Sequence, residues 1–143
     1  MGQEKQETIK VCLDTNVLVS AIGWPGPEAA VVGLVLDGVV SLCITAEVLN
    51  EFYRVCQYPK FGFSEAEVDG FTGRLLINAE LVEPVEKLYI ITGDEPDNRF
   101  LECAVAGRVD YIISGDSHLL KLGFYKDIKI MRAPEFLKLF HGT

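Results

Sequence analysis

Short runs of apolar and β-branched residues recur along the chain, and segments with apolar residues at helical spacing separate them. A short apolar run bounded by turn residues predicts a buried strand, whereas apolar positions three and four residues apart predict a helix. On this basis the pattern predicts strands at residues 9–14, 39–44, 111–114 and 128–131, with a short strand-like piece at 81–84.

The predicted helices fall between these strands, and several of their ends carry capping residues. Pro27 is a favourable first helical residue, and Gly38 is a favourable residue just beyond a helix end. Thr45 is predicted to cap one helix and Ser64 to open a capping box, while Gly107 is expected to end a further helix. The helices are predicted at residues 15–22, 27–37, 46–56, 64–78, 98–106, 117–122 and 134–140.

Alternation of strands and helices along the whole chain predicts an α/β fold. We expect a three-layer α/β/α sandwich in which helices cover both faces of a mostly parallel sheet. Residues 1–8 are polar and are expected to form a flexible tail, followed by a single domain over residues 9–143. Ligands of such sheets bind at the carboxyl ends of the strands, so side chains at those ends are the first candidates for a site.

Composition indicates a folded protein without a membrane span. Hydrophobic residues make up 49% of the 143 residues, and no apolar run approaches the roughly 18 residues that a membrane helix needs. The polar N-terminus lacks the apolar core of a signal peptide, so we expect a cytoplasmic protein with no membrane partner. The four cysteines show no CxxC spacing, which favours buried, reduced thiols over a zinc site.

The net charge of −8 taken alone argues against a nucleic-acid partner, because such partners usually meet a basic face. Two features weaken that argument. Acidic residues that hold a metal ion are neutralised by it. The last 23 residues also carry five lysines and arginines but only two acidic residues, so the C-terminal end is locally basic.

Four acidic residues stand where a site is expected. Asp14 and Asp116 follow apolar strands, Asp97 precedes a helix, and Glu51 borders the apolar stripe of the helix at 46–56. Each of them alone has a structural explanation, since aspartates cap helices and glutamates lie on solvated helix faces. Together they predict a cluster at one edge of the sheet.

A cluster of three or four carboxylates does not stay ionised without a cation. Oxygen ligands with few histidines favour Mg²⁺ or Mn²⁺ over zinc. A metal of this kind lowers the pKa of a bound water and stabilises charge on phosphoryl oxygens. The candidate chemistry is therefore hydrolysis of phosphodiester bonds.

Four segments resemble, in the right order, the motifs of PIN domains. They are VCLDTNVLVSA at 11–21, LNEFYRV with YPKF at 49–61, DEPDNRFLECA at 94–104 and DYIISGDSHLL at 110–120. The resemblance extends over residues 10–140. It implies a compact α/β/α sandwich and cleavage of RNA that depends on Mg²⁺ or Mn²⁺. It also implies a homodimer, and an antitoxin partner if the protein resembles the VapC-like toxins of toxin–antitoxin pairs.

The resemblance also assigns roles to individual residues. It implies that Thr15 and Asn16 support the first aspartate and that Ser114 is a polar helper in the site. At His118 the sequence departs from the pattern, because several relatives carry a further acid there, so a second metal is expected to bind weakly or only with substrate. The implied metal ligands and catalytic residues are Asp14, Glu51, Asp97 and Asp116.

Basic residues near these motifs are candidates for gripping RNA phosphates, although solvated surface charge explains each of them equally simply. Trp24 lies in a Gly-Trp-Pro-Gly loop, where it can stack on a base, pack in the loop or form a dimer contact. The phosphate-contact candidates are Arg54, Lys60, Arg99, His118 and Lys121.

Two other interpretations stay open. Phosphohydrolases of the haloacid-dehalogenase or receiver type also place an aspartate after strand one, but the former need a second aspartate where this chain has Asn16, and the latter need a late lysine. The chain can also be a PIN-like module that binds metal or RNA without catalysis. The sequence does not separate a toxin from a housekeeping nuclease.

Overall fold

A computed structural model describes residues 8–141. The strands are β1 (Ile9–Leu13), β2 (Val40–Ile44), β3 (Ala79–Leu81), β4 (Tyr111–Ile113), β5 (Phe124–Tyr125) and β6 (Ile128–Met131). The helices are α1 (Thr15–Gly23), α2 (Pro27–Leu36), α3 (Ala46–Cys56), α4 (Glu65–Ile77), α5 (Glu95–Gly107), α6 (Ser117–Leu122) and α7 (Ala133–His141), with a 3₁₀ turn, η1 (Pro59–Phe61). Most of the tail predicted at 1–8 lies outside the described residues, so its flexibility stays a prediction.

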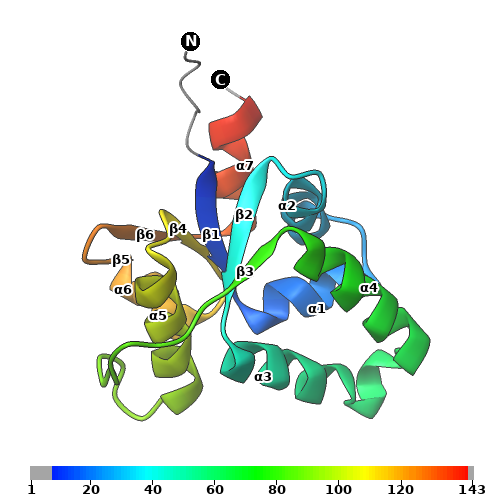
Figure 1. Cartoon of the computed structure of the whole chain (residues 1–143), viewed down its shortest axis with the longest axis horizontal. Coiled ribbons are helices and arrows are strands. Elements are labelled where there is room, and N and C mark those ends of the chain that lie inside the picture. Colours follow the sequence, from blue (N-terminus) through cyan, green and yellow to red (C-terminus); the bar gives the residue numbers. More distant parts are fainter. Residues whose placement is uncertain (1–7, 142–143) are drawn as a thin grey trace.

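The strands form one six-stranded sheet in the order β3-β2-β1-β4-β6-β5 (Figure 1). All neighbouring pairs are parallel except β5 and β6. In the centre, Leu13 of β1 lies opposite Ile113 of β4. Because parallel neighbours end at the same edge of a sheet, the residues that follow β1 and β4 emerge side by side.

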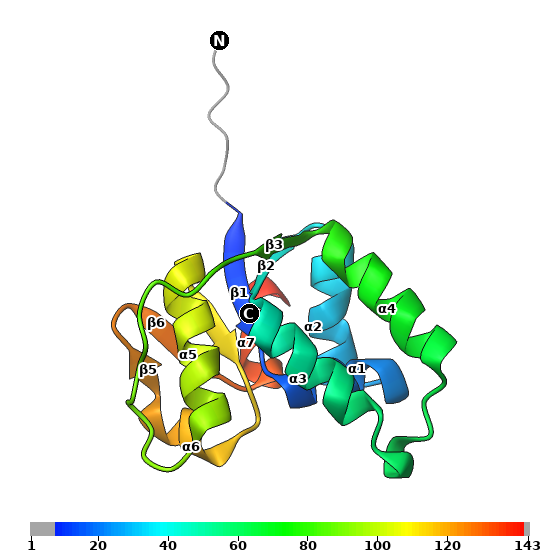
Figure 2. The ribbon, with the colours of Figure 1, turned by 60° about the horizontal axis from the view of Figure 1, so that its bottom comes forward.

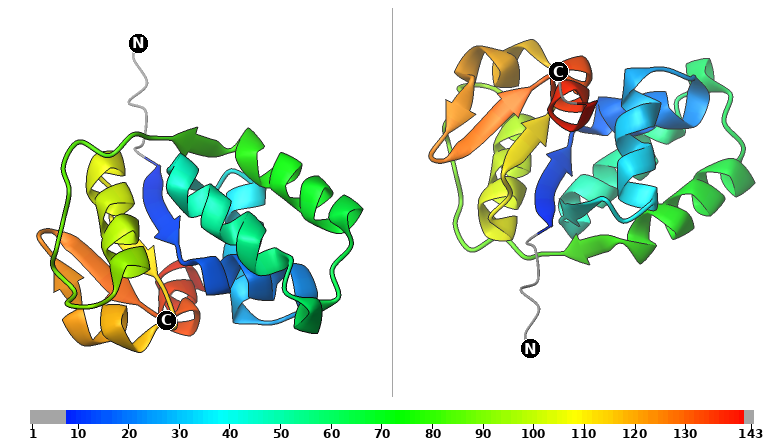
Figure 3. Two further views of the ribbon diagram at one scale, coloured as in Figure 1. Left: turned by 90° about the horizontal axis from the view of Figure 1, so that it is seen from below. Right: turned by 90° about the horizontal axis from the view of Figure 1, so that it is seen from above.

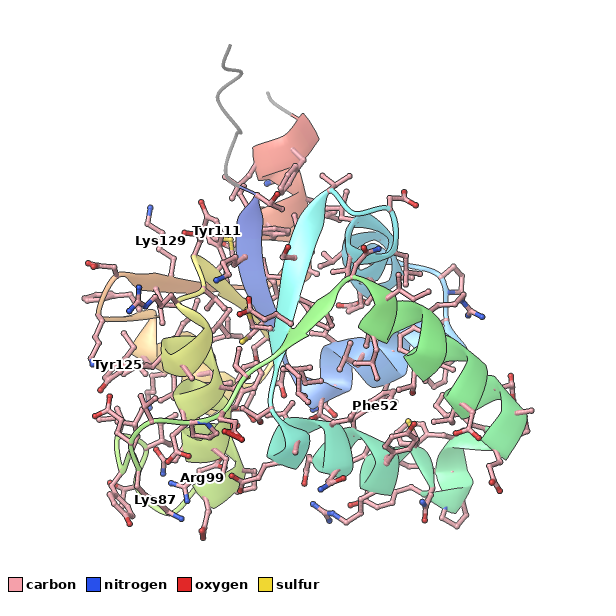
Figure 4. All side chains as sticks on the ribbon, in the orientation of Figure 1. Phe52, Lys87, Arg99, Tyr111, Tyr125 and Lys129 are labelled. Atoms are coloured by element: carbon pink, nitrogen blue, oxygen red, sulfur yellow. The ribbon has the colours of Figure 1, made fainter. Side chains whose placement is uncertain are left out.

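The sheet has an apolar core on each face. Along β1, Val11 contributes to one core and Cys12 to the other, as expected from the alternation of side chains in a strand. The first core is completed by α1, α2, α3, α4 and α7 and contains the fully buried Phe52, which Figure 4 shows between α3 and α4. The second core is completed by α5 and α6 around Leu101 and Leu119. This arrangement confirms the predicted α/β/α sandwich.

The helices separate into two groups in space. Figure 2 shows α5 and α6 on one side of the molecule and α1, α2, α3 and α4 on the other. The predicted caps of the second group are present: the Val48 amide donates to Thr45 Oγ1 over 3.1 Å, and Ser64 forms its capping box with Glu67. Gly38 adopts a positive φ of 76° just after α2, as predicted.

Some predicted boundaries differ from the structure. The third strand lies at Ala79–Leu81 and shares only Leu81 with the predicted range of 81–84. The strand β5 was not predicted, because its two residues show no apolar alternation and pair only with β6. The helix α5 ends with Gly107 as its last residue, one residue later than predicted. A Cβ there would lie 2.7 Å from Cys43 Cβ, so α5 packs closely on β2, and Arg108 takes the left-handed position instead.

Within residues 8–141, no single helix has the length and apolar composition needed to cross a membrane. The helices α1 and α2 meet those criteria only together, and the chain bends by 96° between them.

Candidate metal centre

The first part of the candidate site is a hydrogen-bonded connection between β1 and β4. The Asp14 amide donates to the Ile113 carbonyl over 3.0 Å, which continues the pairing of the two strands. Ser114 Oγ then donates to Asp14 Oδ2 over 2.7 Å. Asp14 precedes α1 without a side-chain capping hydrogen bond, so its carboxylate is directed to the site rather than used to begin the helix.

Ser114 also positions the second aspartate. Its Oγ accepts a hydrogen bond of 2.9 Å from the Asp116 amide. The Asp116 side chain caps α6, because Oδ1 accepts from the amides of His118 at 2.8 Å and Leu119 at 3.3 Å. The capping explanation is therefore correct for one oxygen of Asp116, and the other oxygen is available to a cation.

The third aspartate comes from the first turn of α5. This helix begins at Glu95, three residues earlier than predicted, because Asp94 rather than Asp97 is its N-cap. Asp94 Oδ1 accepts from the Asp97 amide over 3.2 Å. Asp97 is thus inside the helix, where its side chain is buried and is not used for capping.

Four side chains at the starts of α5 and α6, two of them N-caps, form a group of possible metal ligands within the described residues. One ligand atom from each of Asp94, Asp97, Asp116 and His118 lies within 4.8 Å of all the others. His118 Nδ1 is 2.5 Å from Asp94 Oδ2 and 3.8 Å from Asp97 Oδ2. Asp14 is adjacent to this group through Ser114, and its charge interacts with that of Asp116.

The group opens into a cavity of about 350 Å³ between α3 and α5, which lie side by side in both views of Figure 3. The predicted supporting residues Thr15 and Asn16 contribute to its wall. Glu51 reaches the cavity from α3, but its carboxylate pairs with Arg54 and is not among the four grouped ligands. The acidic residues lining the cavity are Asp14, Glu47, Glu51, Asp94, Glu95, Asp97 and Asp116.

The crowding of carboxylates changes their acidity. Burial, together with hydrogen bonding and repulsion from Asp116 and Asp94, raises the pKa of Asp97 to about 9. Burial also raises the pKa of Asp14, an effect that the Ser114 hydrogen bond opposes and the charge of Asp116 increases. At Asp94 burial likewise raises the pKa, but hydrogen bonds from His118 and the Asp97 amide outweigh it and hold the pKa below its ordinary value.

The residues present fit a divalent cation. Asp97 Oδ2 is buried and has no hydrogen-bond partner within the described part of the chain. A buried carboxylate oxygen without a donor is costly, and a cation among the neighbouring carboxylates removes that cost. Several carboxylates and a single imidazole form a donor set for Mg²⁺ or Mn²⁺ rather than for a thiolate-bound metal.

The start of α5 is fastened to the segment that precedes it. Asn98 Oδ1 accepts from the amides of Ile90 at 2.9 Å and Ile91 at 2.8 Å, and Asn98 Nδ2 donates to the Ile91 carbonyl. One turn along, Glu102 accepts from the Leu88 amide over 2.7 Å. These bonds fix the position of the two aspartates at the start of α5 and so act as the outer support of the site.

The structure gives Arg99 a supporting role that was not predicted, and its contact with phosphate stays a prediction. Its guanidinium is only 10% exposed, lies 2.8 Å from Glu102 Oε2 and donates to the Leu88 carbonyl. Figure 4 shows it beside the segment that carries Lys87. The sequence shows a cation near a motif, but not that its charge is paired inside the protein. Arg99 therefore supports α5, and although it lines the cavity, its charge is already paired with Glu102.

The other predicted phosphate contacts are exposed. Arg54 is paired with Glu51, a residue of the cavity wall, and Lys60 lies over the Phe61 ring at 5.1 Å from its centroid. Lys121 is exposed near the end of α6. His118 is exposed too, but it belongs to the acidic group itself.

Asp94 is the site residue that sequence reasoning did not select. It appeared in the sequence only as the first residue of the DEPD segment that contains Asp97. Both residues precede or begin the same helix, and either satisfies the preference for aspartate at a cap. Pro96 distinguishes the two candidate caps, because proline favours the first helical turn and therefore places the N-cap at Asp94.

Comparisons with known proteins agree with this geometry. A family model described as PIN domain matches residues 10–118. Among solved structures, a chain of the complex titled "Crystal structure of VapBC2 from Rickettsia felis bound to a DNA fragment from their promoter" is 18% identical, with a TM-score of 0.58, over 85% of this chain and 97% of that chain. At that identity the likeness shows the fold alone. No curated protein matches the chain.

The raised pKa of Asp97 predicts a pH-dependent stability in metal-free buffer. The folded protein holds a proton at Asp97 up to a pH of about 9, whereas the unfolded chain releases it near 3.8. The folded state therefore binds more protons across this interval, and the free energy of unfolding falls as pH rises through it. When urea unfolding is measured at several pH values, the free energy of unfolding should fall less steeply with pH in Asp97→Asn than in wild type. The exposed Asp69→Asn is the control and should retain the wild-type slope, while equal slopes in all three proteins would contradict the assignment.

A second prediction concerns the support of α5. Asn98→Ala should lower the free energy of unfolding by roughly 1–3 kcal/mol, because it leaves backbone groups without partners, and should reduce the rise in melting temperature that Mn²⁺ produces. Asn78→Ala removes one hydrogen bond to the Leu36 carbonyl, away from the site. It should lower stability but leave the Mn²⁺ effect unchanged. Equal Mn²⁺ effects in both variants would show that Asn98 does not support the metal centre.

Proposed function

The chain belongs to the PIN-domain family, since the family model covers residues 10–118, and we propose that it is a divalent-metal-dependent endoribonuclease. The substrate is RNA, and the reaction is hydrolysis of its phosphodiester bonds with Mg²⁺ or Mn²⁺ as the cofactor. One observation carries the proposal: Asp14, Asp97 and Asp116, from three separate parts of the chain, line one cavity, and Asp97 Oδ2 is buried there without a partner in the described residues.

In the proposed site, Asp14, Asp97 and Asp116 hold the cation, with Asp94 beside them. When bound, a divalent ion of this kind provides a nucleophilic water at neutral pH and stabilises charge on the phosphoryl oxygens. Ser114 Oγ fixes the relative positions of two of these aspartates, because it donates to the carboxylate of Asp14 and accepts from the amide of Asp116. The walls of α3 and α5 restrict water around the reacting phosphate.

Glu51 and Arg54, which form an ion pair with each other, have separate roles in the proposed reaction: Arg54 binds phosphate, and Glu51 orients water or accepts a proton. Their ion pair is at the surface, with the Arg54 side chain 61% exposed, and surface pairs of this kind contribute only about 0–1 kcal/mol. A phosphate in the cavity therefore competes effectively for Arg54. Release of Arg54 frees the Glu51 carboxylate, which then faces the acidic group across the cavity and is placed to orient water or accept a proton.

The surface beyond α3 is suited to single-stranded RNA. Trp24 is 53% exposed, and its ring lies edge-on to Phe61 at 6.2 Å between centroids. Tyr58 stacks with Phe61 at an interplanar angle of 7°, and Lys60 lies next to them. Exposed aromatic rings beside cations are typical of surfaces that stack bases without reading their sequence. The choice of RNA itself rests on the family resemblance.

We further propose that the protein acts as the toxin of a toxin–antitoxin pair, as a homodimer with an antitoxin chain as its partner. The support is the likeness of fold to a chain of the VapBC2 complex. A cavity lined by seven carboxylates is also a surface that a basic segment of a partner protein can close by charge complementarity.

Cleavage is tested with a mixed-sequence RNA in Mn²⁺ and in EDTA. Wild-type protein should cleave only in Mn²⁺. The double variant Asp14→Asn/Asp116→Asn should not cleave, because it loses two of the charges that hold the ion, while the control Asp69→Asn should remain active. A folded wild-type protein that binds Mn²⁺ but leaves every RNA intact would indicate a non-catalytic metal- or RNA-binding module instead.

The aromatic surface gives a separate prediction for binding. In the non-cleaving Asp14→Asn/Asp116→Asn background, Trp24→Ala should weaken binding of a fluorescent single-stranded RNA by about tenfold, because stacking contributes roughly 1–3 kcal/mol per base. The salt dependence of binding should not change, since no charge is removed. Lys60→Ala is the matched comparison and should reduce the salt dependence. Unchanged affinity in Trp24→Ala would place RNA elsewhere.

A further inference from the structure

We propose that His118 is a nitrogen ligand of the metal centre and that it makes the centre prefer Mn²⁺ to Mg²⁺. The inference rests on the proposed metal site and goes beyond it by naming the ion and the residue that selects it. The motif resemblance provides no such role, because the sequence departs from the family pattern at this position.

The geometry places the imidazole inside the group of ligands. His118 Nδ1 is 2.5 Å from Asp94 Oδ2 and 3.8 Å from Asp97 Oδ2. The four ligand atoms of the group lie within 4.8 Å of one another. Ligands that share an ion at about 2.1 Å lie up to about 4.2 Å apart, so small side-chain rotations bring all four to a common ion.

An independent observation points to an ion next to the ring. Asp97 is only 8% exposed, and its Oδ2 has no hydrogen-bond partner within residues 8–141. The nitrogen of His118 faces this same oxygen. A cation between Nδ1 and Oδ2 gives the buried oxygen a partner and also neutralises the charge of Asp94.

The backbone fixes His118 in this place before any ion binds. Its amide donates to Asp116 Oδ1 over 2.8 Å in the first turn of α6. The ring is therefore held two residues from one metal ligand and against another, Asp94. Asp116 Oδ2 is not used in the cap, so an ion at Nδ1 has this second oxygen within reach.

Ligand chemistry gives the selectivity. Mg²⁺ binds oxygen almost exclusively and keeps several waters, whereas imidazole nitrogen suits transition-metal ions. A histidine in the place where relatives carry a further acid weakens Mg²⁺ binding, because the site lacks that negative charge and that hard ligand. Mn²⁺ accepts mixed oxygen and nitrogen ligands, so its affinity for the site is reduced less than that of Mg²⁺. In the alternative arrangement, His118 is only an ion-pair partner of Asp94 that an incoming metal displaces.

The test compares wild-type protein with His118→Asp and His118→Asn. Melting temperatures are measured against Mn²⁺ and Mg²⁺ concentration, since an ion that binds only the folded state raises the melting temperature. We expect wild type to bind Mn²⁺ at least about tenfold more tightly than Mg²⁺. His118→Asp should tighten Mg²⁺ and remove most of the preference, and His118→Asn should weaken Mn²⁺ by about tenfold or more, the range found when an important metal-site partner is lost.

Pulsed electron paramagnetic resonance of the Mn²⁺-loaded protein gives a direct spectroscopic measurement. Wild type should show coupling of Mn²⁺ to an imidazole nitrogen, which is lost in His118→Asp. His141→Ala removes the other histidine of the chain and should keep the coupling. Coupling lost in His141→Ala instead, or absent from wild type, would overturn the proposal.

The remaining outcomes separate this inference from the proposed function. If Mn²⁺ binds without nitrogen coupling and Asp97→Asn abolishes binding, His118 is not a ligand but the metal site stands. If both histidine variants bind Mn²⁺ more tightly than wild type, His118 is a competing counter-ion and the proposal fails. If wild type binds neither ion, the metal site fails together with the inference.

Discussion

Repulsion between carboxylates at one end of a parallel sheet is the constraint to which the rest of this structure responds. The pairing of β1 with β4 brings Asp14 and Asp116 to the same edge, and α5 adds two more acids. In water such groups separate, but here backbone pairing and capping bonds hold them in place. Burial, and then hydrogen bonding with and repulsion from Asp116 and Asp94, raise the pKa of Asp97. A cation relieves this repulsion, so the unfavourable arrangement of charge is also the source of metal affinity.

The scaffold around the site is built to resist this repulsion. Two apolar cores, one on each face of the sheet, hold β1 in a fixed position. The start of α5 is held by Asn98 and by the buried pair of Arg99 and Glu102. A buried pair of this kind adds little net stability but is costly to break. The pair acts here by holding α5 in position, so that Asp97 stays close to the other carboxylates of the site.

The sequence was sufficient to predict the features that depend on local order along the chain. Strands that end on Asp14 and shortly before Asp116 are visible as apolar runs, and alternation with helices predicts the layers. Features that depend on tertiary geometry were not predictable. Nothing in the sequence near Arg99 shows that its partner Glu102 is buried with it. The pairing of Glu51 with Arg54 likewise depends on the side-chain rotamers of both residues, which the sequence does not specify. The choice between Asp94 and Asp97 as the cap is different, because Pro96 favours Asp94 and this signal was not used.

The acidic charge of the chain also has a physical consequence for how RNA approaches. Without a metal, seven carboxylates lining the cavity repel a phosphate backbone, because the one cation in the lining within residues 8–141, Arg99, is paired with Glu102 and the exposed Arg54 is paired with Glu51. A bound divalent ion is the largest local charge and reverses the sign of the field at the centre of the cavity. Attraction then extends from the rim inwards, and Arg54 gains a phosphate partner as it leaves Glu51. In the proposed function, metal binding and RNA binding are therefore linked by charge, and this link reconciles a net charge of −8 with the proposed nucleic-acid substrate.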